Sequence, residues 1–378
     1  MGEVAVTKDI EPYGVYVGVP DKKVKSRNDN MKKMRIGLIG RVADDKCLFD
    51  GQTVKTRTIY HSLIENSFEV ELIDTFEYKK HLILTFLKSI KCIFTCDKII
   101  LSISINGRRV FFPFLFYAKK IFKIDVYHIV IGGALFDEVK EKPIWIKYLN
   151  SFKDNLLESK TLCDKLKEKG VYNARYFPNF KEIKPVALAE IKNNGSSSYK
   201  FCIFSRVNKE KGVCTAIQAI NEINKKLNNK ISILDIYGQV DKEFENEFND
   251  LLIRYNDCVT YKGIIPSNSS VEVLKEYYML LFPSTWKREG MPGTLIDALF
   301  SGLPTIASDW NYNSEIINDK VTGFLYDVNK PETFRNLILY SINNPNLIYK
   351  MRFNCINKAT EFLCDDAIKK LISILSEE

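Results

Sequence analysis

The sequence has 378 residues, enough for two domains, and 46% of them are hydrophobic and 27% charged. These proportions are typical of a globular protein, and the longest uninterrupted apolar run, residues 111–118, is far shorter than the roughly 20 residues that a membrane-spanning helix needs. The nine cysteines lack regular spacing and lie mostly in apolar segments, which indicates reduced thiols and a cytoplasmic location. With only three histidines, we expect no metal centre.

The net charge of +8 is concentrated in one part of the chain. Residues 34–185 carry 26 Lys and Arg against 18 Asp and Glu, whereas residues 186–378 carry 22 against 24. We therefore expect an anionic partner on the first part. The chain has no recognisable nucleic-acid-binding motif, so we do not expect that partner to be a nucleic acid.

Residues 1–30 differ in pattern from the rest of the chain. The stretch V-T-K-D-I-x-P-Y-G-V-Y-V-G-V-P within them resembles the last coil and exit strand of hexapeptide-repeat acyltransferases. One coil of such a solenoid cannot bury its own apolar face, and this segment has no His to act as a base. We interpret it as an appended remnant, or as a start assigned too early, with little stable structure of its own; an irregular arm would look the same.

From residue 34 onward, apolar runs that indicate buried strands alternate with helical segments. This alternation predicts parallel sheets covered on both faces, whose ligands lie at the carboxyl ends of the strands. The strands expected in the first domain are residues 34–40, 68–74, 98–104 and 124–132.

Three residues of this first domain are candidates for contacts with a ligand. Gly51 and Gln52 lie in the loop that follows the first strand and opens a helix, although an ordinary turn before a helix would look almost the same. His128 is expected at the end of a strand, where it could hydrogen-bond a hydroxyl group or assist a proton transfer. A purely structural histidine is an equal alternative.

Residues 79–96 have the pattern of a basic amphipathic helix. Apolar residues from Leu82 to Ile93 recur on one face, and Lys88 and Lys91 lie on the other. Such a segment either lies on an anionic membrane surface or packs into the core with its lysines solvated. The sequence leaves both interpretations open.

A stretch rich in Asn, Gly and Ser marks residues 186–199 as a flexible linker. The next apolar strand ends in R-V-N-K-E-K-G, where Arg206 and Lys211 are five positions apart in a strand-to-helix loop. The two cations can converge on one point, where Arg grips two phosphate oxygens and Lys adds a mobile charge.

The sequence pattern between residues 279 and 309 is strand, glycine-rich loop, helix and strand. We expect Thr294 to cap the helix, with Glu289 in the loop before it and Asp297 in its first turn. A helix N-terminus behind such a loop offers free N–H groups to a phosphate, and the carboxylates can accept hydrogen bonds from sugar hydroxyls.

These residues carry a resemblance to a known family. E-G-M-P-G-T-L-I-D-A resembles the E-x7-E motif of retaining glycosyltransferases of family 4, the glycosyl transferases group 1, with Asp297 where the family usually has Glu. The basic loop resembles the G-R-L…K-G motif of the same family. The resemblance implies an α/β fold of the GT-B type, in which two Rossmann-like domains face each other across a cleft. It assigns acceptor binding to residues 34–185, nucleotide-sugar binding to residues 200–360, and a helix that packs back on the first domain to residues 361–378.

The resemblance also implies an activity. It is the metal-independent transfer of a hexose or N-acetylhexosamine, without a cofactor, from a nucleotide sugar, expected to be UDP-linked, to a lipid-linked or oligosaccharide acceptor in capsule or exopolysaccharide assembly. Peripheral association with the inner membrane face would suit such an acceptor. The implied catalytic residues are Glu289, Arg206 and Lys211. The donor is expected to contact these three together with Gly290, Met291, Pro292, Gly293, Thr294 and Asp297, and the acceptor is expected to contact Gly51, Gln52 and His128.

Two alternatives remain open at this point. A nucleotide-sugar epimerase can share the fold but would lack the paired motifs. A degenerate, non-catalytic protein is suggested by Asp297 and by residues 1–30.

Overall fold

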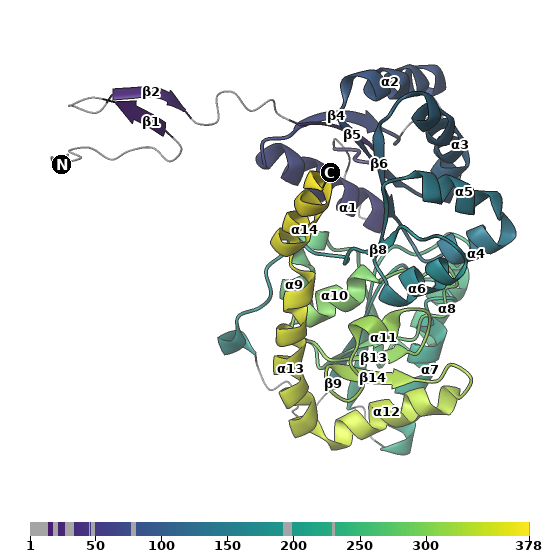
Figure 1. The fold of residues 1–378 in the computed structure, drawn as a ribbon. Coiled ribbons are helices and arrows are strands. Elements are labelled where there is room, and N and C mark those ends of the chain that lie inside the picture. The colour runs from purple at the N-terminus through teal and green to yellow at the C-terminus, as the bar shows by residue number, and fades with distance from the viewer. Residues whose placement is uncertain are drawn as a thin grey trace.

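The fold consists of two six-stranded parallel sheets with helices packed around them, one above the other in Figure 1. Alternating strands and helices in the sequence predicted this α/β architecture, and the prediction is confirmed. The computed structural model describes residues 14–17, 22–26, 34–44, 46, 50–76, 81–191, 199–228 and 231–377.

The first sheet has the strand order β4-β3-β5-β6-β7-β8. Its central strands β3, β5 and β6 are mostly apolar and are buried after their first residue, because helices cover both faces of the sheet; Ile36, Leu38 and Ile39 of β3 are completely buried. Its strands are β3 (Arg35–Gly40), β4 (Glu69–Asp74), β5 (Lys98–Ile103), β6 (Asp125–Val130), β7 (Asp154–Leu157) and β8 (Ala174–Tyr176).

The second sheet has the strand order β11-β10-β9-β12-β13-β14. The order reverses between β9 and β12, so the loops that leave these two strands diverge and open a crevice at their carboxyl ends. This crevice is where an open α/β sheet binds its ligand. The strands are β9 (Tyr199–Phe204), β10 (Ser232–Tyr237), β11 (Val259–Gly263), β12 (Met279–Phe282), β13 (Thr305–Ser308) and β14 (Gly323–Tyr326).

Helices connect the strands and cover the sheets. In the first domain they are α1 (Gly51–Glu65), α2 (Leu82–Thr95), α3 (Ile105–Ile121), α4 (Leu135–Glu141), α5 (Ile144–Ser151) and α6 (Lys160–Glu168). In the second they are α7 (Val213–Lys226), α8 (Glu245–Arg254), α9 (Ser270–Leu274), α10 (Gly293–Phe300), α11 (Asn313–Ile316), α12 (Pro331–Asn343) and α13 (Pro345–Ala359). The last helix, α14 (Cys364–Ser376), belongs to the first domain by its packing.

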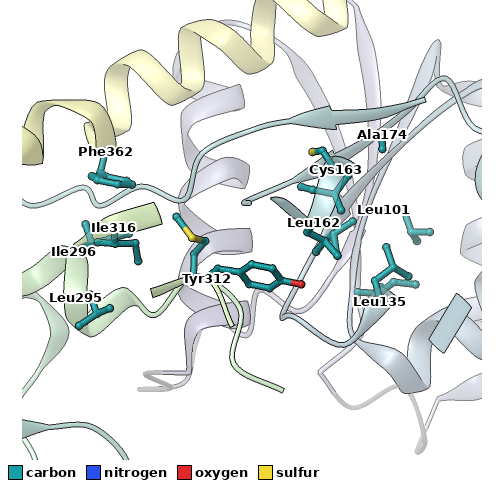
Figure 2. Close-up of a cluster of buried hydrophobic side chains, with 14 of the residues drawn as sticks. Leu101, Leu135, Leu162, Cys163, Ala174, Leu295, Ile296, Tyr312, Ile316 and Phe362 are labelled. Atoms are coloured by element: carbon teal, nitrogen blue, oxygen red, sulfur yellow. The ribbon is translucent and has the colours of Figure 1, made fainter. Parts of the chain in front are cut away.

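The two domains share a buried apolar cluster. Figure 2 shows Leu162 of α6 on one side, Ile296 of α10 on the other, and Tyr312 pointing between them. A hydrogen-bonded contact reinforces this interface, since the carboxylate of Glu315 accepts bonds from the Ser159 hydroxyl at 2.5 Å and from the Lys160 amide at 2.7 Å, at the start of α6. The side chain of one domain thus caps a helix of the other.

The chain returns to the first domain at its end. Helix α14 buries Ile368, Leu371 and Leu375 in an apolar cluster that also contains Leu38 of β3. Figure 1 shows this last helix running up to the first domain. The connection between the domains is therefore double, because the chain crosses once after β8 and again before α14.

The sequence left open whether helix α2 packs into the core or lies on a membrane surface, and the structure shows that its two halves differ. Its C-terminal half packs inward through Cys92 and Ile93. Its N-terminal half does not, because Leu82 is 57% and Phe86 is 48% exposed. Core packing therefore accounts for only part of the apolar face.

The prediction for residues 1–30 lies mostly outside the described residues. Two short strands within it, β1 (Gly14–Val17) and β2 (Lys22–Ser26), pair antiparallel with each other. Residues 192–198 of the predicted linker also lie outside the described part.

Candidate functional site

A cavity of about 840 Å³ lies between the two domains at the carboxyl ends of their strands. It sits at the reversal point of the second sheet, where the loops after β9 and β12 diverge. Its lining residues from the first domain and the crossing segment are Arg41, Asp50, Gly51 and Lys181. Those from the second domain include Ser205, Arg206, Asn208, Lys211, Gly238, Trp286, Glu289, Gly293, Thr294 and Asp297.

The loop after β9 brings Arg206 and Lys211 to this cavity, as their spacing suggested. The side chain of Arg206 is 55% exposed and its Nε lies 3.7 Å from Asp241 Oδ1, so it remains accessible to a ligand. Lys211 is largely buried. The loop turns sharply at Gly212, whose φ of +74° and close approach to the Pro283 carbonyl leave no room for a side chain.

The loop after β12 carries Glu289 to the same point. Its Oε2 accepts a hydrogen bond from Lys211 Nζ and another, at 3.0 Å, from the Ser284 hydroxyl. The backbone of this loop lies against the first domain, where a Cβ added at Gly133 would lie only 2.1 Å from the Glu289 carbonyl oxygen. The Gly-Gly pair after β6 therefore allows the first domain to approach the Glu289 loop.

Helix α10 begins at Gly293, with Pro292 in the capping position. The prediction that Thr294 caps the helix is therefore wrong. Its hydroxyl donates a 2.7 Å hydrogen bond to the Phe204 carbonyl instead, and so ties the helix to the end of β9. Asp297 is consequently the fifth residue of the helix and lies beyond its first turn.

Asp297 is almost completely buried, with 4% of its surface exposed. Lys181 Nζ lies 3.0 Å from its Oδ2, and the Ser270 hydroxyl donates to its Oδ1 at 3.2 Å. Burial raises the pKa of Asp297, while the charge of Lys181 lowers it. The net direction is upward, because burial outweighs the opposing effect of Lys181 on this pKa.

Among the residues that the structure describes, each carboxylate that lines the cavity has a basic partner. Asp50 is bound by Arg41, Glu289 by Lys211, and Asp297 by Lys181. With Arg206 added, the described part of the chain lines the cavity with four cations and three carboxylates, a net charge of +1. A ligand with two or more negative charges can therefore form ion pairs with basic side chains that, in the free protein, pair with its own carboxylates.

The three predicted acceptor residues lie in different places. Gly51 lines the cavity, and Gln52 lines a second hollow of about 210 Å³ beside it, between α2 and α3. His128 reaches neither, because it lies in the middle of β6 and is completely buried. Its Nδ1 lies 3.1 Å from Asn155 Oδ1, and burial lowers its pKa to about 3. The structure corrects its predicted role: it is a neutral core residue.

Gly290, Met291 and Pro292 do not line the large cavity. Gly290 and Met291 line a small hollow at the domain interface instead, and the Met291 carbonyl accepts a 3.0 Å hydrogen bond from Asn179. These residues therefore hold the Glu289 loop against the first domain.

Sequence reasoning missed three charged residues of the cavity. Arg41 directly follows the first strand, and Asp50 caps α1 by accepting a hydrogen bond from the Thr53 amide. Both positions could have been found from the sequence, Arg41 by the end of the strand and Asp50 by the start of the helix. No local sequence feature marked Lys181, because its ion-pair partner, Asp297, lies 116 positions further along the chain.

Residues 188–362 match the family model "Glycosyl transferases group 1". The uncharacterized glycosyltransferase MJ1069 of Methanocaldococcus jannaschii is 26% identical over 159 residues, which are 42% of this chain and 40% of that protein. The UDP-Gal:alpha-D-GlcNAc-diphosphoundecaprenol alpha-1,3-galactosyltransferase of Escherichia coli is 30% identical over 114 residues, 29% of either chain. The chain thus matches less than half the length of these curated relatives.

Among solved structures, the chain is similar to Anabaena Alr3699/HepE in complex with UDP, with a TM-score of 0.71 and 14% identity. The match covers 91% of this chain and 100% of that one, and HepE has also been solved with UDP-glucose. At this identity the likeness concerns the fold. The chain therefore has the two-domain GT-B fold, and its residues 188–362 are similar to the Glycosyl transferases group 1 model.

Proposed function

We propose that this protein is a retaining glycosyltransferase that takes a hexose or N-acetylhexosamine from a UDP-linked sugar. One observation carries the proposal: Arg206, Lys211, Glu289 and the N-terminus of α10 meet in one cavity at the reversal point of the second sheet. The matching family model spans the domain that supplies all four.

The cations have the central task in this mechanism. Arg206 and Lys211 neutralise the charge that develops on the departing diphosphate, which supports a reaction without a metal ion or other cofactor. When the diphosphate draws Lys211 toward it, the carboxylate of Glu289 is released to hold hydroxyl groups of the donor sugar. The family resemblance assigns the ribose to Asp297; in this chain Lys181 covers that carboxylate.

Retention of the anomeric configuration is what the family resemblance implies, and the carboxylates of the cavity are assigned roles that agree with it. We assign none of Asp50, Glu289 and Asp297 as the nucleophile of a double displacement, because cations hold Asp50 and Asp297 and the hydroxyl groups of the donor engage Glu289. The acceptor hydroxyl then attacks on the face from which UDP departs, and its proton passes to the leaving phosphate oxygen. The anomeric configuration of the sugar is retained.

We further propose a lipid-linked acceptor, of the kind used in capsule or exopolysaccharide assembly at the inner membrane face. The E. coli relative is named for a diphosphoundecaprenol acceptor. Here, an apolar surface on α2 and α3 borders the hollow beside the cavity and has exposed Lys88, Lys120 and Lys123 around it. This α2–α3 surface consists of Leu82, Ile83, Leu84, Phe86, Leu87, Phe94, Val110, Tyr117 and Ile121, each at least 48% exposed.

Among the helices that the structure describes, none combines the length and apolar character that a bilayer crossing requires. Attachment through the α2–α3 surface would therefore be peripheral. Exposed apolar side chains above a basic rim suit the interface of an anionic bilayer.

Introducing charge into the α2–α3 surface should abolish attachment to vesicles. Ile83 is 79% and Leu87 56% exposed, so Ile83→Glu with Leu87→Glu should leave the fold intact. Each replaced side chain removes roughly 1.5–3 kcal/mol of burial in the membrane, so binding should fall at least about tenfold. Flotation with phosphatidylglycerol-containing vesicles measures this. Ile253→Glu on α8, at a site 73% exposed, is the matched control, and equal binding by all three proteins would contradict the proposal.

Replacing Arg206 by Ala should weaken UDP binding by about 10- to 100-fold, since a charge-assisted hydrogen bond contributes roughly 1.5–3 kcal/mol. Calorimetric titration with UDP, GDP and ADP measures the loss and the base preference. Lys209→Ala is the control, because Lys209 belongs to the same loop but pairs with Glu247 at 2.6 Å, away from the cavity.

Failure of the wild-type protein to bind any nucleotide would favour the degenerate, non-catalytic alternative. Conversion of a UDP-sugar to its epimer without transfer would favour an epimerase.

A further inference from the structure

The backbone of Lys181 lies in the segment that joins the two domains, and its side chain extends into the cavity. Its backbone lies where the two connections run side by side: its amide donates to the Phe362 carbonyl at 3.1 Å, and it forms a parallel bridge with Leu363. Its side chain, 17% exposed, leaves this crossing and reaches the second domain, where Nζ lies 3.0 Å from Asp297 Oδ2.

The ammonium group of Lys181 lies beside the N-terminus of α10. A Cβ added at Gly293, the first residue of the helix, would lie 3.2 Å from Nζ and 3.3 Å from Cε of Lys181. Because Gly293 has no side chain, the end of the Lys181 side chain can lie against this turn of the helix. A helix N-terminus carries a partial positive charge and repels a cation there. Asp297, one turn into the same helix, offsets this repulsion.

The arrangement leaves capacity for one more anion. An ammonium group has three N–H donors, and Asp297 accepts one of them in the structure. Gly293 and Thr294 at the start of α10 line the same cavity, and Arg206 and Lys211 line it from the loop after β9. A polyanion bound here would be in reach of cations from both sides.

We propose that Lys181 is a third diphosphate-binding cation of the donor site, and that Asp297 is a positioning residue that holds the ammonium beside α10. The inference rests on the proposed function, since it specifies how the same cavity binds a nucleoside diphosphate. It also gives Asp297 a different task from the direct ribose contact that the family resemblance implied. With 4% of its surface exposed and Lys181 bound to it, Asp297 acts on the ligand through the lysine.

The test compares ligands that differ only in phosphate content. Calorimetric titrations with uridine, UMP and UDP are carried out on wild type, Lys181→Met, Lys181→Arg and Lys184→Met. We expect Lys181→Met to weaken UDP at least tenfold while uridine changes less than twofold, and Lys181→Arg to recover most of the UDP affinity. Lys184, an exposed lysine of the same connecting segment, is the control and should bind as wild type does.

A double variant guards against a folding defect, because Lys181→Met alone leaves the Asp297 carboxylate buried without its cation. Lys181→Met with Asp297→Asn removes both charges and should show the same selective loss of UDP affinity. Equal losses for uridine and UDP, or unchanged UDP affinity, would overturn the assignment while the proposed function stands. If wild type binds no uridine nucleotide, the proposed function fails and the inference fails with it.

Discussion

Replacing Glu289 by Gln should lower the rate of sugar transfer by roughly 10²- to 10³-fold or more, the loss expected when a preorganised polar group of an active site is removed. The melting temperature should change little. The amide has nearly the same shape as the carboxylate and can still accept the hydrogen bond from Ser284. It cannot match the charge of Lys211, whose ammonium group pairs with Glu289 in the free protein.

The measurement is the release of UDP from UDP-sugars in the presence of membranes that supply a lipid-linked acceptor. Glu210→Gln is the matched control, because Glu210 lies in the loop after β9, its side chain is exposed, and its contact with Thr285 is made by the backbone carbonyl. Turnover by Glu289→Gln at the wild-type rate would remove Glu289 from its proposed role, whatever the control shows.

The largest effect on stability is expected at Arg108. The side chain is 1% exposed and forms two parallel hydrogen bonds with Glu138, Nε to Oε2 at 2.9 Å and Nη2 to Oε1 at 2.7 Å, which join α3 to α4. Arg108→Leu leaves the carboxylate of Glu138 buried without a partner. The free energy of unfolding should fall by about 3–5 kcal/mol.

Chemical denaturation of three variants separates the causes. Arg109→Leu, at the exposed neighbouring position, should leave the free energy of unfolding nearly unchanged. Arg108→Met with Glu138→Leu removes both charges and should recover most of the loss, because an apolar pair of similar volume avoids the cost of burying ions. A loss below about 1 kcal/mol in Arg108→Leu would mean that water reaches Glu138.

The sequence by itself predicted the elements that depend on local pattern. Apolar runs such as residues 34–40 and 279–282 are strands because their side chains are buried on both faces of a sheet, whatever packs against them. The same logic placed Arg206, Lys211 and Glu289 in loops that follow strands. Since parallel strands end at one edge, those loops met in one cavity.

The tertiary structure decided what depends on distant partners. His128 has the same local sequence whether it faces a cleft or the core, and the packing of Phe112 and Phe152 around it selected the core. Leu82 and Phe86 follow the pattern of a buried helix face, but no other part of the described chain covers the first turns of α2 enough to bury them.

The pair of Lys181 and Asp297 shows the same limit at the site itself. Asp297 was visible in the sequence as a shortened form of a family acid, but its cation comes from the crossing between the domains. Charge, spacing and periodicity describe neighbours along the chain. An ion pair across 116 positions exists only because two separately folded sheets dock and bring the crossing segment over the start of α10. The sequence therefore determined which elements form and which loops meet, whereas the docking of the domains decided which charges the cavity presents to its ligand.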